Sequence, residues 1–333
     1  MVNSTQVRKL FKKFSSCRVL IIGDVMIDSY MFGKVERISP EAPIPIVTSS
    51  HKKNRLGGAA NVALNIKSLG ATPLLCSVIG KDDNANMLLE RLEAQGISPE
   101  GLIQTKKRKT TVKTRVISQH QHLLRVDEEE DTPLSASLEK RLLEVIYKIL
   151  SQSIDAVIFE DYDKGVITPA IIEKTIELAN EYNIPVLVDP KKRNYHQYKN
   201  IKLFKPNFRE LIEGSKTDLE KSDHGRLFTL AKKLHREKNI ELVFITLSEA
   251  GVFISDGESY STIPAEIREI TDVSGAGDTL IATASLCCAA GLTPFDIASI
   301  SNLAGGLVCE KSGVVPVNRD DLMEEMLIKL GKD

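Results

Sequence analysis

The chain has 333 residues, of which 42% are hydrophobic and 27% charged, a composition typical of soluble globular proteins. Its 44 basic and 45 acidic residues leave a net charge of −1, so charge gives no reason to expect binding to nucleic acid or to a membrane. No apolar run reaches the ~20 residues of a membrane span, and the basic N-terminus lacks the apolar core of a signal peptide. The five cysteines show no C-x-x-C spacing, which indicates core residues in a reducing, cytoplasmic environment.

Apolar runs alternate with segments of helical periodicity along most of the chain. In chain order, the predicted elements are strand 19–22, helix 59–69, strand 74–79, helix 84–94, strand 156–159, helix 169–182, strand 186–188, helix 226–237, strand 242–246, a hairpin over 252–262, and two closing helices, 276–290 and 295–310. Strands that are apolar throughout and alternate with helices predict an α/β fold. Its sheet would be mainly parallel and covered on both faces.

Two segments, 28–48 and 110–127, interrupt this alternation because neither contains a helical pattern. Residues 111–117 alternate between polar and apolar side chains, as a half-exposed strand does. We predict that both segments join in one small sheet, a lid that lies over the main domain and excludes water from a reaction site. The alternative is an extra edge sheet without that role. Residues 1–333 would then form a single domain with the lid as its insertions.

The segment Gly275-Ala-Gly-Asp278 opens an apolar stretch that we predict to be a buried helix. The first turn of a helix has N–H groups without partners, and glycines let a ligand approach them, so this point is a candidate anion site. Asp278 could take a proton from a hydroxyl while the site stabilises a transferring phosphoryl group. The alternative is simple capping by Asp272 or Ser274, with Asp278 as an ordinary first-turn charge.

Two further motifs favour a ligand with hydroxyl groups. Gly57 and Gly58 precede a predicted helix, and Asn61 in its first turn can donate to and accept from sugar hydroxyls. Asp28 follows the end of the first strand, where ligands of open α/β sheets bind. The alternatives are close helix packing through the small residues and an ordinary turn aspartate.

Asn207 and Glu210 lie three residues apart, at a predicted helix start after Lys205-Pro206. This spacing fits a capping box. It also fits a pair of side chains that hold Mg²⁺ through water, because Mg²⁺ keeps much of its hydration shell. The sequence leaves both readings open.

Three of these motifs follow one another along the chain: Gly57-Gly58 with Asn61, Lys205-Pro206-Asn207 with Glu210, and Gly275-Ala-Gly-Asp278. In this order they resemble the ribokinase-like sugar kinases, also called the phosphofructokinase-B family. The resemblance implies a three-layer βαβ domain with a β-sheet lid, and ATP and Mg²⁺ as cofactors. It also implies Asp278 as the catalytic base and the amides of Gly275, Ala276 and Gly277 as the anion hole. The nucleotide contacts that it implies are Asn207, Glu210, Thr246, Ser248, Gly251 and Asn302.

Segments 23–28, 37–43, 161–165 and 189–191 resemble more narrowly the D-glycero-β-D-manno-heptose-7-phosphate kinases of bacterial ADP-heptose synthesis. This resemblance implies transfer of the γ-phosphoryl group of ATP to O1 of the sugar phosphate in the bacterial cytoplasm. The expected substrate contacts are Asp28, Gly57, Gly58, Asn61 and Lys191. The alternatives are a kinase for another sugar, such as a hexose phosphate, and a sugar-binding regulator without activity.

The chain departs from that group at two positions. Glu160 stands where a serine is common, and Leu247 where an arginine is common. In many bacteria the kinase is fused to a nucleotidyltransferase, but no H-x-G-H motif of that enzyme is present here, so we expect a separate protein to supply that step. We also expect a homodimer joined lid to lid, because the lid segments carry more apolar area than one lid can bury. The apolar side chains on which this expectation rests are Ile44, Ile46, Val112, Val116 and Leu124.

Overall fold

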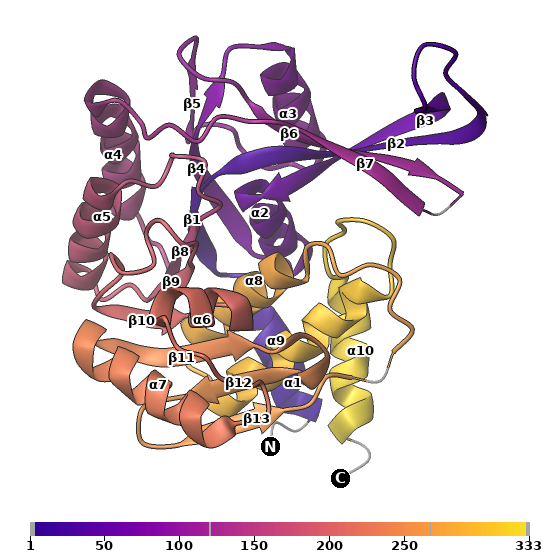
Figure 1. The fold of residues 1–333 in the computed structure, drawn as a ribbon. Helices are drawn as coiled ribbons and strands as arrows, with labels where there is room; N and C mark the ends of the chain where they lie inside the picture. Colours follow the sequence, from indigo (N-terminus) through magenta and orange to yellow (C-terminus); the bar gives the residue numbers. More distant parts are fainter. Residues whose placement is uncertain (1–3, 120, 267, 331–333) are drawn as a thin grey trace.

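The computed structural model describes residues 4–119, 121–266 and 268–330. Its larger sheet runs in the order β13 (Tyr260–Ile263), β12 (Val252–Ser255), β11 (Ile240–Thr246), β10 (Ile201–Phe204), β9 (Val186–Asp189), β8 (Ala156–Glu160), β1 (Arg18–Gly23), β4 (Thr72–Gly80) and β5 (Leu102–Thr105). Neighbouring strands from β5 to β11 are parallel, and β12 and β13 are antiparallel. The predicted α/β fold with a mainly parallel sheet is confirmed (Figure 1).

Helices cover both faces of this sheet because its strands are apolar on both sides. On β1, Val19 and Ile21 face one core, and Leu20 and Ile22 face the other. The first core is completed by α1 (Ser4–Phe14), α2 (Ala59–Ser68), α3 (Asp83–Ala94), α8 (Ala276–Ala289), α9 (Pro294–Cys309) and α10 (Arg319–Leu330). The second core is completed by α4 (Ala136–Leu150), α5 (Pro169–Glu181), α6 (Phe208–Ser215) and α7 (His224–Lys238). The result is a three-layer sandwich.

A second, smaller sheet extends from the main body (Figure 1). We call it the small sheet; its order is β3 (Pro45–Gly58), β2 (Val25–Ile38), β6 (Thr111–Ser118) and β7 (Gln121–Glu128). Strands β2 and β6 are parallel, and the outer pairs are antiparallel. The strands reach further than the predicted segments, since β2 begins directly after β1 and β3 runs on to the start of α2. The small sheet is therefore continuous with the main body.

The sequence analysis missed three helices. It assigned no element to the region of α4, although Leu138, Leu142 and Ile146 recur every four residues and pack in the second core. It also named two closing helices, which is wrong because α10 follows them. Helix α1 carries Val7, Leu10, Phe11 and Phe14 at helical spacing, so the pattern that predicts a helix was present in the sequence and was overlooked. No described helix is both long and apolar enough to cross a membrane.

Candidate active site

Helix α8 begins without a side-chain cap, at the carboxyl edge of the parallel strands. Gly275 is the N-cap residue, with a φ of 82° that favours glycine. Among the described residues, the amides of Gly277 and Asp278 have no hydrogen-bond acceptor, whereas the Ala276 amide donates to Val273 O at 3.3 Å. The capping alternative is wrong, since neither Asp272 nor Ser274 caps the helix. The free amides and the helix dipole give this point the character of an anion site.

Asp278 lies in the first turn of α8 and is only 5% exposed. Asn61 Nδ2 donates to its Oδ2 at 2.7 Å, and the Tyr162 hydroxyl donates to its Oδ1 at 2.8 Å. Burial raises the pKa of the Asp278 carboxyl to about 6, the charges of Asp189 and Asp28 also raise it, and the two hydrogen bonds lower it. The group is therefore an ionised carboxylate at neutral pH with a pKa suited to accepting a proton.

Asn61 was predicted to bind sugar hydroxyls, and in the structure its amide nitrogen donates to Asp278. Its side chain is fully buried in α2. Asn65, one turn later, donates to the Asn61 carbonyl at 2.9 Å and accepts from Thr279 of α8 at 3.1 Å. These bonds join α2 to α8 at the level of Asp278, so the position of the carboxylate is fixed from two helices.

Asp28 lies on β2 of the small sheet, and its carboxylate is ion-paired with Arg115 on β6. A Cβ on Gly57 would lie 2.1 Å from Asp28 Oδ2, so only glycine leaves room for this carboxylate. Gly58 ends β3 at a φ of 57°, and a Cβ there would lie 2.4 Å from the Asp24 carbonyl oxygen. The predicted substrate residues of this motif thus lie together where the small sheet meets α2.

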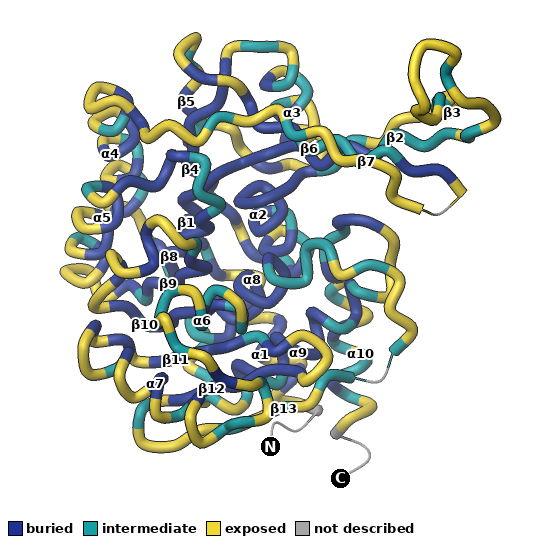
Figure 2. Tube along the Cα trace, viewed as in Figure 1, coloured by how far each residue is buried: buried dark blue, intermediate teal, exposed yellow. Residues whose placement is uncertain are grey.

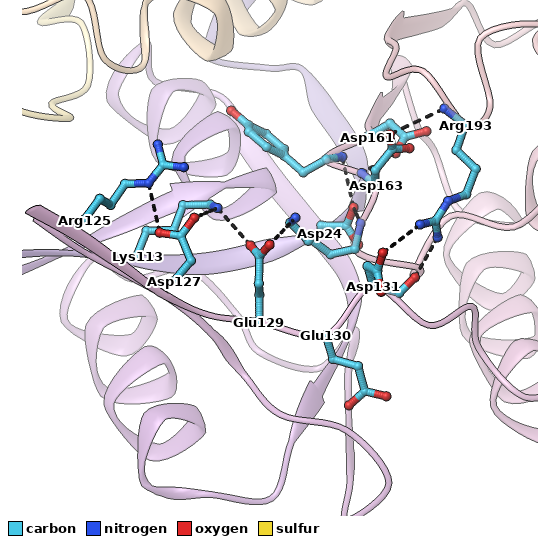
Figure 3. A network of polar contacts seen from close by, with 12 residues as sticks. Asp24, Lys113, Arg125, Asp127, Glu129, Glu130, Asp131, Asp161, Asp163 and Arg193 are labelled. Carbon is cyan, nitrogen blue, oxygen red and sulfur yellow. Dashed lines mark hydrogen bonds and ion pairs between the residues drawn. The ribbon is translucent and has the colours of Figure 1, made fainter.

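A loop between β8 and α5 supplies the second hydrogen bond to Asp278, and the sequence analysis did not assign it a role. The Asp24 carboxylate accepts from the amides of Tyr162, Lys164 and Val166 at 2.9, 3.0 and 3.1 Å. Figure 3 shows Asp24 beneath this loop, close to Asp161 and Asp163. The stretch 161–165 was noted only as a family-like motif, and local sequence gave no sign that its tyrosine reaches α8.

Two lysine–acid pairs flank the start of α8. Lys205 Nζ lies 2.7 Å from Asp189 Oδ2, both side chains being almost fully buried. The same two atoms lie 3.7 and 3.8 Å from the position that a Cβ on Gly277 would take. Lys191, a predicted substrate residue, is ion-paired with Glu210. The ammonium group of Lys205 and the carboxylate that neutralises it therefore both lie beside Gly277.

Asn207 and Glu210 form the capping box that their spacing allowed. Glu210 Oε2 accepts from the Asn207 amide at 2.8 Å, and Asn207 Oδ1 accepts from the Glu210 amide at 2.9 Å. Glu210 Oε1 contacts Lys191, so both carboxylate oxygens already have a donor. Among the described residues, no group of three or more acidic, His or Cys side chains could hold a metal ion. Glu210 and Asn207 would therefore contact Mg²⁺ through its water ligands and not directly.

Glu160, which stands where the family commonly has a serine, is buried. In register with Asp189 on β9, it projects toward the face of the sheet that α8 covers. It is 1% exposed, and its Oε2 has no hydrogen-bond partner among the described residues. Burial raises the pKa of the Glu160 carboxyl well above its ordinary value, and the charges of Asp189 and Asp278 add to this. Burial in this position therefore favours the neutral form of the Glu160 carboxyl.

A cavity of about 380 Å³ opens beside the start of α8. Ala276 and Gly277 line one end of it. Four of the predicted nucleotide contacts also line it: Thr246, Ser248, Gly251 and Asn302. Asn207 forms a bridge with Thr246 at its edge. Leu247, which stands where the family commonly has an arginine, is buried in the second core and does not line the cavity. The four predicted nucleotide contacts therefore line one cavity, which ends at the candidate anion site.

Residues 17–320 match the pfkB family of carbohydrate kinases. The chain belongs to this family. The bifunctional protein HldE of Citrifermentans bemidjiense is 37% identical to it over 322 residues, which are 96% of this chain and 66% of HldE. HldE of Helicobacter pylori is 39% identical over 297 residues, which are 89% of this chain and 64% of HldE. The pfkB-family kinase therefore spans about two thirds of the length of these relatives.

Solved structures agree on the fold of this carbohydrate kinase. Phosphofructokinase-2 from Escherichia coli, in complex with potassium, superimposes with a TM-score of 0.77 at 18% identity, covering 95% of this chain and 99% of that one. Ribokinase from Arabidopsis thaliana, complexed with ribose and ATP, gives a TM-score of 0.73 at 16% identity, covering 96% and 99%. The ribokinase-like fold with a large sheet and a second small sheet is confirmed.

Proposed function

We propose that this kinase transfers the γ-phosphoryl group of ATP to O1 of D-glycero-β-D-manno-heptose 7-phosphate. The observation that carries the reaction type is the position of Asp278. It is a buried carboxylate in the first turn of α8, next to amides that have no partner among the described residues. Ala276 and Gly277 of the same turn line the cavity. A base beside an anion site is the arrangement that phosphoryl transfer to a hydroxyl requires.

In the proposed reaction, Asp278 accepts the proton of the O1 hydroxyl as O1 attacks the γ-phosphorus. The bond from the γ-phosphorus to the oxygen bridging it to the β-phosphorus breaks, and ADP leaves with that oxygen. The amides at Gly277 and Asp278 and the ammonium group of Lys205 stabilise the charge on the transferring group. When bound, Mg²⁺ would neutralise charge on the phosphates, with Glu210 and Asn207 contacting its waters.

The choice of sugar rests on sequence. The segments 23–28, 37–43, 161–165 and 189–191 resemble heptose 7-phosphate kinases, and HldE proteins match nearly the whole chain. We propose that the sugar lies between Asp28 and Asp278, with its hydroxyls near the Gly57–Gly58 turn. The product, a 1,7-bisphosphate, would enter ADP-heptose synthesis for lipopolysaccharide core in the bacterial cytoplasm, where ATP is available.

We propose that the small sheet is a lid over this sugar. Register places Asp28 and Arg115 on the face of the small sheet that bears Tyr30, and Tyr30 accepts from the Val314 amide of the main body at 3.2 Å. This face is therefore directed toward the site. A lid here would exclude water, which otherwise competes with the sugar for the phosphoryl group.

The opposite face of the small sheet supports the proposal of a lid-to-lid homodimer. Val116 and Leu124 are paired across β6 and β7, and Val126 shares their face. Leu124 is 60% exposed and Val126 45% exposed, and Figure 2 shows β7 exposed along most of its length. One expectation was wrong: Val112 is buried in the first core and offers no apolar surface. Apolar side chains left uncovered on a sheet favour pairing with a second copy.

A panel of sugar phosphates tests the proposed function. Heptose 7-phosphate, fructose 6-phosphate, ribose and water alone are each incubated with ATP and Mg²⁺, and ADP release is measured. We expect the heptose phosphate to give the largest kcat/KM. Faster turnover of fructose 6-phosphate would show that the proposed heptose substrate is wrong. No ADP release above the water control would overturn the kinase assignment.

A further inference from the structure

Each oxygen of Asp278 is held by one donor from a different part of the fold. Oδ2 accepts from Asn61 of α2, and Oδ1 accepts from Tyr162 of the β8–α5 loop at 2.8 Å. A carboxylate has about four acceptor positions, so an oxygen with one donor can still accept from a substrate hydroxyl. Two donors from fixed elements define the plane of the carboxylate, which decides whether a lone pair points at that hydroxyl.

The loop that carries Tyr162 is held firmly from below. Three of its amides donate to the buried Asp24 carboxylate. The side chain of Asp161, at the start of the loop, accepts from Asn194 and Tyr198, each at 2.9 Å. A loop with its amides and its first side chain bonded to the core has little freedom, so the Tyr162 hydroxyl is delivered to a defined point.

The same loop is tied to the small sheet by a chain of charges. Lys164 Nζ lies 2.8 Å from Glu129, which also contacts Lys113 of β6 at 2.9 Å. Lys113 in turn contacts Asp127 of β7 at 3.1 Å. Figure 3 shows this chain running from Arg125 and Asp127 through Lys113 to Glu129. The position of Tyr162 is thus set by both the core and the small sheet.

We propose that Tyr162 is a positioning residue for Asp278, whose hydroxyl orients the carboxylate and keeps it ionised at the pH of the reaction. The proposal rests on the proposed function, in which Asp278 is the base. Burial and the charge of Asp278 raise the pKa of the Tyr162 phenol well above its ordinary value, so the group stays a donor while Asp278 is an anion. Removing this donor would raise the pKa of Asp278, since the bond stabilises its charged form.

Other charged groups face Asp278, and the test must leave them in place. Asp28 comes from β2, Glu160 from β8 and Asp189 from β9; Lys205, after β10, pairs with Asp189. None of them is hydrogen-bonded to the Tyr162 hydroxyl in the described part of the chain. Substitution of that hydroxyl by hydrogen therefore changes one interaction with Asp278 and leaves the surrounding charges unchanged.

The variant Tyr162→Phe tests this role because it keeps the ring, over which Lys191 Nζ lies at 5.3 Å. We expect the acid limb of kcat against pH, near pH 6 in the wild type, to move up by about one pH unit. At pH 6 this is about a fivefold loss of kcat. The KM for ATP should not change, because Tyr162 does not line the cavity. The matched control is Tyr195→Phe, whose buried hydroxyl has no partner among the described residues and should leave the limb unmoved.

A second measurement does not depend on activity. ¹³C NMR of carboxyl-labelled aspartate, with the Asp278 signal assigned by its loss in Asp278→Asn, reports the pKa of this group directly. A higher pKa in Tyr162→Phe supports the proposal, and an unchanged pKa overturns it whether or not the protein turns over a sugar. A wild type without kinase activity would instead refute the proposed function, so the two failures are distinguishable.

Discussion

Asn61 and Asp278 are 217 positions apart in the sequence, and the Asn61 amide donates to Asp278 Oδ2 at 2.7 Å. Both side chains are buried, one in α2 and the other in the first turn of α8. The bond links the Gly57–Gly58 motif to the Gly275–Gly277 motif. The two glycine-rich motifs of the family therefore form one site, in which the proposed sugar contact also orients the proposed base.

Asp278→Asn should nearly abolish turnover and leave the fold intact. The amide has almost the same shape but cannot accept the proton, and loss of a general base lowers kcat about 10²–10⁴-fold. ADP release under saturating ATP and sugar measures this. Asp83→Asn, on the exposed first turn of α3, is the control and should keep full activity. A kcat above about a tenth of the wild-type value in Asp278→Asn would exclude Asp278 as the base.

Glu210→Gln distinguishes a role toward Mg²⁺ from simple helix capping. Glutamine can replace glutamate in a capping box, so capping alone predicts a mild change. The substitution also removes the negative charge that faces Lys191 and, in the proposed reaction, the waters of Mg²⁺. We therefore expect a higher Mg²⁺ requirement and a lower kcat. The measurement is activity against Mg²⁺ concentration, with thermal unfolding to monitor the cap. An unchanged Mg²⁺ curve at full kcat would leave capping as the only role.

Glu160→Gln should stabilise the protein, increasingly so at higher pH. The pKa of Glu160 is raised in the folded state, so above about pH 4.3 the unfolded chain loses this proton before the folded one does. The wild type then loses about 1.4 kcal/mol of stability per pH unit until the folded carboxyl ionises. Glutamine has no such loss.

Chemical denaturation at pH 5 and pH 8 measures this difference. Glu90→Gln on α3, an exposed position, serves as the control and should show no pH-dependent gain. If Glu160→Gln changes the free energy of unfolding equally at both pH values, Glu160 is ionised in the folded protein and has a partner that compensates its charge.

The outer face of the small sheet should hold two copies together. Leu124→Asp with Val126→Lys places charges at two exposed apolar positions of β7, and we expect it to convert a dimer into a monomer. Light scattering at micromolar concentration measures the mass. Phe295→Asp on α9, at an equally exposed apolar position, should remain dimeric. A monomeric wild type, or a double variant with the mass of a dimer, would refute the proposed interface.

Sequence predicted best those features that depend on neighbouring residues. Apolar strands and glycine-terminated helices marked the sheet and the helices around it, and the Asn207–Glu210 spacing marked a capping box that the structure contains. The start of α8 was located because two glycines precede Asp278. Helix α1 was missed although Val7, Leu10, Phe11 and Phe14 recur at helical spacing, so this error came from reading the sequence and not from a missing signal.

Contacts between distant elements could not be read from the sequence. Asn61 looked like a free amide because its partner lies on another helix, and the strand order that brings Glu160 beside Asp189 follows only from the assembled sheet. Tyr162 shows the limit most clearly. Residues 161–165 were noted only for their resemblance to a family. The position of the Tyr162 side chain depends on the conformation of this loop, which is held by hydrogen bonds to Asp24, just after β1.

The most direct test of the proposed reaction is ³¹P and ¹H NMR of the purified protein with ATP, Mg²⁺ and D-glycero-β-D-manno-heptose 7-phosphate. We predict a new phosphate signal coupled to the anomeric proton, formed in equal amount with ADP and absent when Asp278→Asn replaces the wild type. Phosphorylation at any other oxygen, or ADP formation without a sugar bisphosphate, would contradict the account.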